Sequence, residues 1–236
     1  MVRFGGTRME GIFQTLGVAD TKIESNVITK SISSAQRRVE GYNFDIRKTL
    51  LEYDDVLRQQ REIIYEQRNM ILDNDDVHDI ILGMFKQTMD NVVNTNMESG
   101  SRTNVDFEGL AHGLETLGVP VTESYINTLR NLDSAMIKED IRNYALQQYE
   151  DKIAPFTEQI YPLEKRILLT IIDRMWIDHN DIMSKLRDGI NLRSYASSDP
   201  LQAYIQEGYQ LFDEMMDKIS TEMVQYCTKI QIIAKE

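Results

Sequence analysis

Apolar positions recur at helical spacing along one long stretch near the start of the chain. The stripe runs from Ile32 to Ile71, and Gln60 and Gln67 occupy the same register. Intervals of three and four residues predict one long helix with a single buried face. A helix of this length rises roughly 60 Å, which exceeds the width of a small domain. We therefore expect it to bridge several parts of a larger assembly or to pair with another long helix. Its apolar or small positions are Ile32, Ala35, Val39, Tyr42, Ile46, Leu50, Tyr53, Leu57, Ile64 and Ile71.

Shorter amphipathic segments fill the middle of the chain. The polar run 73–76 ends the long helix and supplies side-chain caps for the next one. The predicted helix at about Phe107 to Leu117 should end at Gly118, because glycine readily takes the left-handed conformation that closes many helices. The predicted helices are about Val77 to Met97, about Phe107 to Leu117, and one helix from a cap at Thr122 or Ser124 to about Ile153.

Two longer amphipathic segments complete the chain. Pro162 suits the first turn of one helix, and Asp199-Pro200 combines an N-cap with proline at the first helical position of the other. Two helices of about 30 residues joined by a short loop predict an antiparallel hairpin. The expected fold is all-α, with a long helix, an antiparallel two-helix finger at about 162–232, and a small helical segment inserted at 73–155.

Composition supports a helical, reducing-compartment protein. The 236 residues include only 12 Gly and 4 Pro, and so few helix breakers favour long helices. No stretch approaches 18 consecutive apolar residues, and the first residues make a poor signal peptide. The single cysteine, Cys227, excludes an internal disulfide and a cysteine-based zinc site. These features predict a cytosolic setting.

Charge is unevenly distributed along the chain. The net charge of −12 argues against nucleic acid as a partner. Between Asp73 and Asp151 there are 15 acidic and 5 basic residues, whereas residues 36–68 hold seven of each sign. This concentration of acidic residues suggests a separate unit in the middle of the chain.

The candidate chemical groups do not assemble into an active site. The three histidines, His78, His112 and His179, lack the spacing of a metal-ligand set. His179 is interpreted as a packed or hydrogen-bonded side chain, and Cys227 as a small buried one. Residues 4–6, Phe-Gly-Gly, have neither of the glycine spacings that bind nucleotide phosphates. A helical enzyme with its own active site is therefore disfavoured.

The loop between the last two helices is the strongest candidate for a binding site. Arg193 and Tyr195 stand in a polar segment where no core requires a tyrosine. Tyrosine offers a large contact area at low entropic cost and can hold irregular polypeptide. The residues alone leave a functional tip and a plain helix–helix turn equally open.

Several strings resemble the SecA family of ATP-driven protein-export motors. Residues 35–68, AQRRVEGYNFDIRKTLLEYDDVLRQQREIIYEQR, resemble the start of the family's long scaffold helix. Residues 176–204, WIDHNDIMSKLRDGINLRSYASSDPLQAY, resemble its W-x-(D/E)-H…LR-x-GI-x-LR-x-Y segment. RFGGTRM at 3–9 resembles the exit from the family's second nucleotide-binding domain. The middle block, 73–155, agrees only in position and helical character.

The resemblance implies a domain assignment. Residues 1–24 would be the trailing end of the second nucleotide-binding domain, and 25–72 with 156–236 the helical scaffold domain. Residues 73–155 would be the helical wing domain. The hairpin would be the family's two-helix finger, with Tyr195 and Arg193 near its tip, contacting preprotein at the SecY channel. Ser194 stands where the family usually has glycine.

The resemblance also implies partners and cofactors. Preprotein, the SecY channel complex and the rest of the SecA motor are the expected partners, with an anionic membrane surface reached only through the parent motor. ATP and magnesium are expected for the full-length parent, which would be cytoplasmic and peripheral at the inner face of the cell membrane. This chain lacks a Walker A segment, so we expect no ATP hydrolysis by it alone.

The same observations leave two origins and two functions open. The chain is expected to be an excised fragment of such a motor, with a natural truncation as the other origin. The alternative function is a stand-alone helical adaptor or regulator that binds a protein partner through the finger or the acidic wing.

Overall fold

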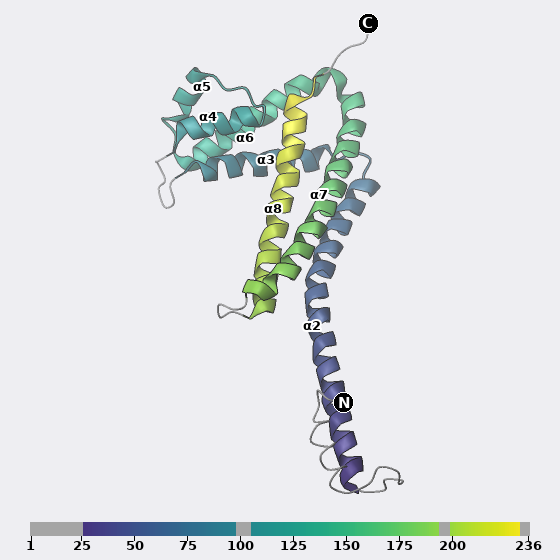
Figure 1. Cartoon of the computed structure of the whole chain (residues 1–236). Helices are drawn as coiled ribbons and strands as arrows, with labels where there is room; N and C mark the ends of the chain where they lie inside the picture. Colours follow the sequence, from purple (N-terminus) through teal and green to yellow (C-terminus); the bar gives the residue numbers. More distant parts are fainter. Residues whose placement is uncertain (1–25, 98–104, 194–198, 232–236) are drawn as a thin grey trace. The chain divides into compact units, whose positions relative to one another are not determined.

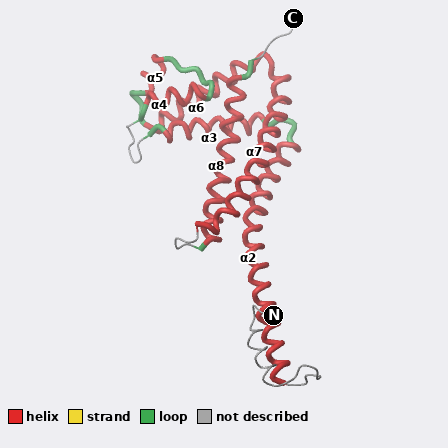
Figure 2. Tube along the Cα trace, in the orientation of Figure 1, coloured by secondary structure: helices red, strands yellow, loops and turns green. Residues whose placement is uncertain are grey.

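The computed structural model describes residues 26–97, 105–193 and 199–231. Helices account for nearly all of these residues, and the described ranges contain no β-strand beyond one isolated bridge between Met97 and Val105 (Figure 2). The predicted all-α class is therefore confirmed. The chain divides into two compact units, residues 1–56 and residues 57–236.

The long helix predicted from the apolar stripe is α2, which runs without a break over Asn26–Asp73. Its first part belongs to the first unit, where large side chains such as Phe44 and Leu51 are exposed. The helix ends in the polar run, as predicted. The Asn74 backbone N–H and side-chain amide both donate to the Met70 carbonyl, at 3.2 and 2.9 Å. These bonds satisfy one of the carbonyls that every helix end leaves without a partner.

After the last part of α2, the second unit continues with α3 (His78–Thr95) and α4 (Phe107–Thr116). Both match the predicted segments. The Asp106 carboxylate caps α4 by accepting from the Glu108 and Gly109 backbone N–H groups at 3.1 and 3.0 Å. The chain leaves this helix at Gly118, which has a φ of +82° as expected for a glycine-terminated helix. A Cβ at Gly118 would also lie 2.8 Å from Cγ of Lys229, so the position is sterically closed.

The single helix predicted up to Ile153 is wrong, because the segment forms α5 (Glu123–Leu129) and α6 (Ser134–Ile153). Thr122 is the N-cap of α5, and its hydroxyl accepts from the Tyr125 N–H at 3.2 Å. A second cap, Asp133, starts α6 by accepting from Ala135 and Met136 N–H at 3.1 and 2.9 Å. This carboxylate competes with the backbone carbonyls for helix donors, so it favours a new helix start over continuation.

The predicted helix start at Pro162 is also wrong. A 3₁₀ turn, η2 (Ala154–Phe156), leads into α7 (Thr157–Arg193), which contains Pro162 in its interior. Proline there removes one backbone hydrogen bond and costs about 3 kcal/mol. The turn before it is held by packing, because Ile160 is buried in the core. Apolar burial of about 1.5–3 kcal/mol per large side chain offsets much of that cost.

The last helix is α8 (Pro200–Lys229), and it begins as predicted. The Asp199 carboxylate accepts from the Leu201 N–H at 3.0 Å, with proline at the first helical position. Helices α7 and α8 pack along each other in opposite directions (Figure 1). The predicted antiparallel pairing of the last two helices is therefore observed. Helix α3 packs on both α8 and α6.

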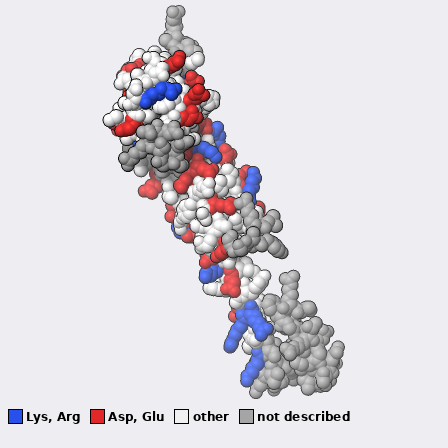
Figure 3. Space-filling model, turned by 90° about the vertical axis from the view of Figure 1, so that its left-hand side faces the viewer, with Lys and Arg blue, Asp and Glu red and all other residues white. Residues whose placement is uncertain are grey.

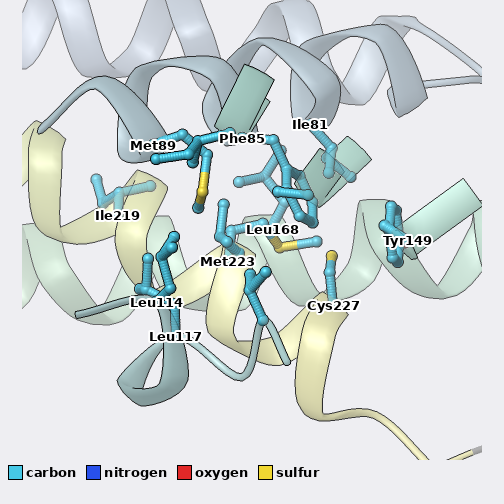
Figure 4. Close-up of a cluster of buried hydrophobic side chains, with 14 of the residues drawn as sticks. Ile81, Phe85, Met89, Leu114, Leu117, Tyr149, Leu168, Ile219, Met223 and Cys227 are labelled. Atoms are coloured by element: carbon cyan, nitrogen blue, oxygen red, sulfur yellow. The ribbon is translucent and has the colours of Figure 1, made fainter. Parts of the chain in front are cut away.

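One hydrophobic core joins the helices of the second unit. Figure 4 shows side chains from α3, α4, α6, α7 and α8 converging, and Ile81, Phe85, Met89 and Met223 are fully buried. The described acidic residues of the middle segment are exposed or half-buried, and red Asp and Glu side chains are visible on the face that the upper end of Figure 3 presents. The sequence-based domain boundaries at 24, 72 and 155 stay predictions.

Candidate functional site

The predicted fingertip lies at the edge of what the structure describes. Arg193 is the last residue of α7, but its side chain lies outside the described part, as do Ser194 and Tyr195. Their proposed contact with preprotein therefore stays a prediction. The described residues instead contain two buried polar clusters that fasten the helices of the second unit together.

The first cluster centres on Gln60 of α2, whose side chain is fully buried. Its Nε2 donates to the backbone carbonyl of Gly208 on α8 at 2.9 Å. Its Oε1 accepts from Nε2 of His179 on α7, also at 2.9 Å. A carbonyl can only accept, so the amide nitrogen must face Gly208 and the His179 Nε2 must carry a proton. One side chain thus binds the long helix to both helices of the hairpin.

Aromatic rings enclose this Gln60 cluster. The His179 ring stacks on Trp176 at 5.7 Å between centroids and meets the edge of Phe212 at the same distance. Tyr65 of α2 contacts Trp176 edge-on at 6.5 Å. Burial lowers the pKa of His179 below its ordinary value, because the charged imidazolium would lose its hydration. The cluster is therefore neutral at physiological pH.

Exposed polar contacts extend the same junction along α2. Arg68 forms a two-bond pair with Asp173 of α7 at 2.8 and 3.3 Å, which raises the pKa of Arg68. Nζ of Lys165 donates to the carbonyls of Leu72 and Asn74 at 2.9 and 2.8 Å, where α2 ends. Solvent screens exposed pairs of this kind. The hydrogen bonds of the buried Gln60 amide are screened less than these exposed contacts, so we expect them to fix the position of α2 on α7 and α8 more strongly.

The second cluster centres on His78, the first residue of α3. Its Nδ1 lies 3.1 Å from Oε1 of Glu164 on α7, and its Nε2 lies 3.0 Å from Oε1 of Glu150 on α6. The Tyr149 hydroxyl donates to Glu164, and the Tyr161 ring stacks on His78 at 4.6 Å. The Glu164 side chain is only 3% exposed, whereas that of Glu150 is 42% exposed.

These contacts change how the His78 cluster titrates. Burial alone would lower the pKa of His78, but the hydrogen bonds to Glu150 and Glu164 outweigh it and raise the pKa. Burial raises the pKa of Glu164, although bonds from Tyr149 and His78 oppose the shift. Burial also raises the pKa of the neighbouring Cys227 thiol to about 12, so this cysteine is not a nucleophile. The interpretation of Cys227 as a small buried side chain is confirmed.

Neither cluster is arranged for metal binding or covalent catalysis. Within residues 26–97, 105–193 and 199–231, no group of three or more His, Cys, Asp or Glu side chains could hold a metal ion. The interpretation of His179 as a hydrogen-bonded side chain is confirmed. Gln60 carried a sequence signal, since it was a polar residue in an apolar stripe. His78 and Glu164 lie 86 residues apart, so no spacing rule could pair them.

Comparison with known proteins identifies the family. The family model described as the SecA Wing and Scaffold domain matches residues 22–231. The chain belongs to this SecA wing and scaffold family. Curated relatives include the protein translocase subunit SecA of Clostridium botulinum (strain Alaska E43 / Type E3), which is 38% identical over 232 residues. The protein translocase subunit SecA of Clostridium tetani is 40% identical over the same length.

The match covers nearly all of this chain but a smaller part of its relatives. The alignments include 97% of the chain and 28% of the length of each of these two proteins. The described residues fall within the part of the chain that matches the SecA wing and scaffold model. Among them, no helix is both long and apolar enough to cross a membrane.

Proposed function

We propose that this SecA wing and scaffold chain couples ATP-driven motion to preprotein movement in a SecA-type export motor at the SecY channel. Its relatives are protein translocase subunits, which supports a role in protein export. One observation carries the coupling role: the buried amide of Gln60 binds the 48-residue helix α2 to both α7 and α8. The chain would then act as the coupling and substrate-engaging part of the larger protein.

The proposed coupling rests on the stiffness of a continuous helix. Every interior residue of α2 is held by a backbone hydrogen bond, so displacement along the helix is not absorbed as it would be in a loop. Separating Gln60 from its partners would leave buried polar groups unsatisfied, at about 1–3 kcal/mol for each group. Helices α7 and α8 therefore have a physical reason to move with the part of α2 that carries Gln60.

The tip of the hairpin is the proposed point of contact with preprotein. The segment that contains Ser194 and Tyr195 joins the end of α7 at Arg193 to the cap of α8 at Asp199. A tyrosine flanked by an arginine can bind varied polypeptide through ring contacts and backbone hydrogen bonds. We propose that Tyr195 makes the main contact, with Arg193 and Ser194 shaping the loop.

ATP and magnesium belong, in this proposal, to other parts of the full-length motor. The sequence lacks the glycine-rich pattern that binds phosphates, and the described carboxylates are not grouped as magnesium ligands. The residues present therefore do not fit the nucleotide. We expect the purified chain neither to bind nor to hydrolyse ATP, and measurable turnover would contradict this assignment. The proposed location is cytoplasmic, peripheral at the inner face of the membrane.

The coupling proposal can be tested in a full-length motor. Residues 22–231 of this chain would replace the matching segment of the Clostridium tetani SecA, and ATP hydrolysis and ATP-dependent preprotein transport into SecY-containing vesicles would be measured. We expect the chimera to transport preprotein. Gln60→Leu should lower the amount transported for each ATP hydrolysed, whereas Gln59→Leu, at a half-exposed neighbouring position, should not. Equal coupling in both variants would overturn the role of Gln60.

The tip can be tested in the same chimera. Tyr195→Ala should reduce transport while leaving the binding of the motor to vesicles unchanged, and Tyr195→Phe should retain most of the activity. Unchanged transport by Tyr195→Ala would remove the case for a specific contact by this tyrosine.

A further inference from the structure

His78 lies where three helices of the second unit meet, and it contacts ionisable groups on all sides. Its ring nitrogens face Glu164 on α7 and Glu150 on α6. Tyr149 of α6 and Tyr161 of α7 lie beside the ring, and Cys227 of α8 adjoins Tyr149. On its own side, Asp76 accepts from the His78 backbone N–H at 2.8 Å, and Asp79 is the next residue of α3. The groups that contact the ring are thus mainly acidic.

The proton count of this arrangement depends on pH. An imidazolium has two N–H groups, so it can donate to both carboxylates at once. A neutral imidazole has one N–H, so one ring nitrogen must present a lone pair to a carboxylate oxygen about 3 Å away. The bridge between α6 and α7 through His78 is therefore complete only when the ring is charged.

The two carboxylates differ in how they can respond when that proton leaves. Glu164 is 3% exposed and cannot turn to water, so it needs to keep its donors from Tyr149 and from Nδ1 of His78. Glu150 is 42% exposed and can be solvated where it stands. Leaving the buried Glu164 carboxylate without a donor costs more free energy than losing the contact with the half-exposed Glu150. The remaining proton of His78 should therefore stay on Nδ1.

We propose that His78 is a pH-sensitive switch that fastens the end of α6 to the start of α3 while Nε2 is protonated and releases Glu150 when Nε2 loses its proton. The contact with Glu164 on α7 persists in both states. The released segment is the last turn of α6 and η2, up to Phe156. This inference concerns the junction around α3 and does not rest on the proposed export function.

A hollow adjoins Tyr149 and the end of α6. It has a volume of about 490 Å³ and is lined by Tyr149, Lys152, Gly118 and Thr228, among others. Lys152 closes one side by donating to the Thr228 carbonyl at 2.7 Å. When Glu150 is released, the bond from Lys152 to Thr228 still ties the end of α6 to α8, so the segment should loosen without detaching.

The switch can be tested on the purified chain by nitrogen-15 NMR of its histidines. The sequence holds only three, so single substitutions to Gln assign His78, His112 and His179. We expect the His78 titration midpoint to lie above the ordinary value of about 6.5. Above that midpoint, the nitrogen shifts should show the proton on Nδ1. A neutral His78 protonated on Nε2 would overturn the proposal.

Hydrogen exchange provides the structural readout. The exchange rates are first corrected for the intrinsic pH dependence of exchange. Protection of the backbone amides at 150–156, Pro155 excepted, should then fall about tenfold as pH rises through the His78 titration midpoint. A tenfold change is the scale of one charge-assisted hydrogen bond. Glu150→Gln should lower the His78 titration midpoint and abolish the fall in protection. The reason is that a neutral amide neither stabilises the His78 imidazolium nor repels the lone pair on Nε2. The matched control, Asp151→Asn, removes a neighbouring exposed charge and should retain the step. A step that survives Glu150→Gln, or is absent from the natural chain, would overturn the switch.

Discussion

The second unit uses two buried histidines in opposite ways. His78 bridges two carboxylates on α6 and α7, whereas His179 donates to the neutral amide of Gln60. Both are largely buried, at 7% and 2% exposed. Yet the pKa of His78 is raised by its acidic partners, against the effect of burial, and the pKa of His179 is lowered by burial without any opposing charge. Burial alone therefore does not determine the charge of a histidine, because the chemical partners decide it.

The difference matters for what each junction can do. The His179 junction ties α2 to α7 and α8 through groups that stay uncharged near neutral pH, so it is suited to a constant mechanical link. The His78 junction holds carboxylates and a titrating ring at the meeting of α3, α6 and α7, so it can respond to pH. Substitutions at both junctions test this contrast.

The largest effect is expected from Glu164→Ala in the His78 cluster. The change leaves His78 and the Tyr149 hydroxyl without their buried acceptor, and breaking a buried charged pair costs about 3–5 kcal/mol. The free energy of unfolding, measured by denaturant titration, should fall by that amount. Glu158→Ala, an exposed site near the start of the same helix, is the control. A similar loss in both variants would show that the buried contacts of Glu164 add nothing to stability.

A smaller loss is expected from Gln60→Leu in the His179 cluster. Leucine fills similar space but leaves the His179 N–H and the Gly208 carbonyl without a partner, at about 1–3 kcal/mol of unfolding free energy for each. Gln59→Leu removes an exposed contact with the Tyr209 hydroxyl at a half-buried position and should cost much less. Equal losses of unfolding free energy in the two variants would mean that the buried amide of Gln60 stabilises the chain no more than the exposed contact of Gln59.

The two histidines should differ in the sign of their pH dependence. The raised pKa of His78 means that its contribution is fully present below about pH 6.5 and is lost as pH rises through the raised value. The lowered pKa of His179 means that its contribution is present above about pH 6.5 and is lost in acid. His78→Gln should therefore destabilise the chain more at about pH 6 than at about pH 9.

The opposite comparison applies to His179→Gln. This variant should lose more unfolding free energy at about pH 7.5 than at about pH 5, because the natural chain is itself weakened in acid by protonation of a buried ring. Denaturant titrations of each variant and of the natural chain at the two pH values named for it give the measurement. The same sign for both histidines would contradict the contrast drawn here.

The smallest effect is expected from Asp173→Asn. It breaks the pair with Arg68, which lies on the exposed side of the α2 junction. Solvent already screens this pair, so the unfolding free energy should stay nearly unchanged. A loss as large as that of Gln60→Leu would show that the exposed pair, and not the buried amide, holds α2 in place.

Local patterns predicted much of the helical framework. The apolar stripe gave α2 to within a few residues, and Asp199 with Pro200 marked the start of α8. Gly118 marked the end of α4 because only a residue without a Cβ readily adopts its backbone angle. These features are set by residues close together in the chain, so spacing and capping rules reach them.

The errors occurred where tertiary packing competes with local preference. The core holds Ile160 in place, so α7 starts before Pro162 although proline disfavours a position inside a helix. The break before α6 is marked by the Asp133 cap, which the prediction of one helix up to Ile153 did not use. The candidate fingertip at Arg193, Ser194 and Tyr195 stays a prediction.

Periodicity, caps and motifs are local properties, so they were enough to predict a helical chain, most of its helix ends and the family that it resembles. Which polar groups meet could be read only from the packed helices. Gln60 finds Gly208 across 148 residues, and His78 finds Glu164 across 86. Those pairings depend on how whole helices pack, and the charge of each histidine follows from the partner that packing supplies.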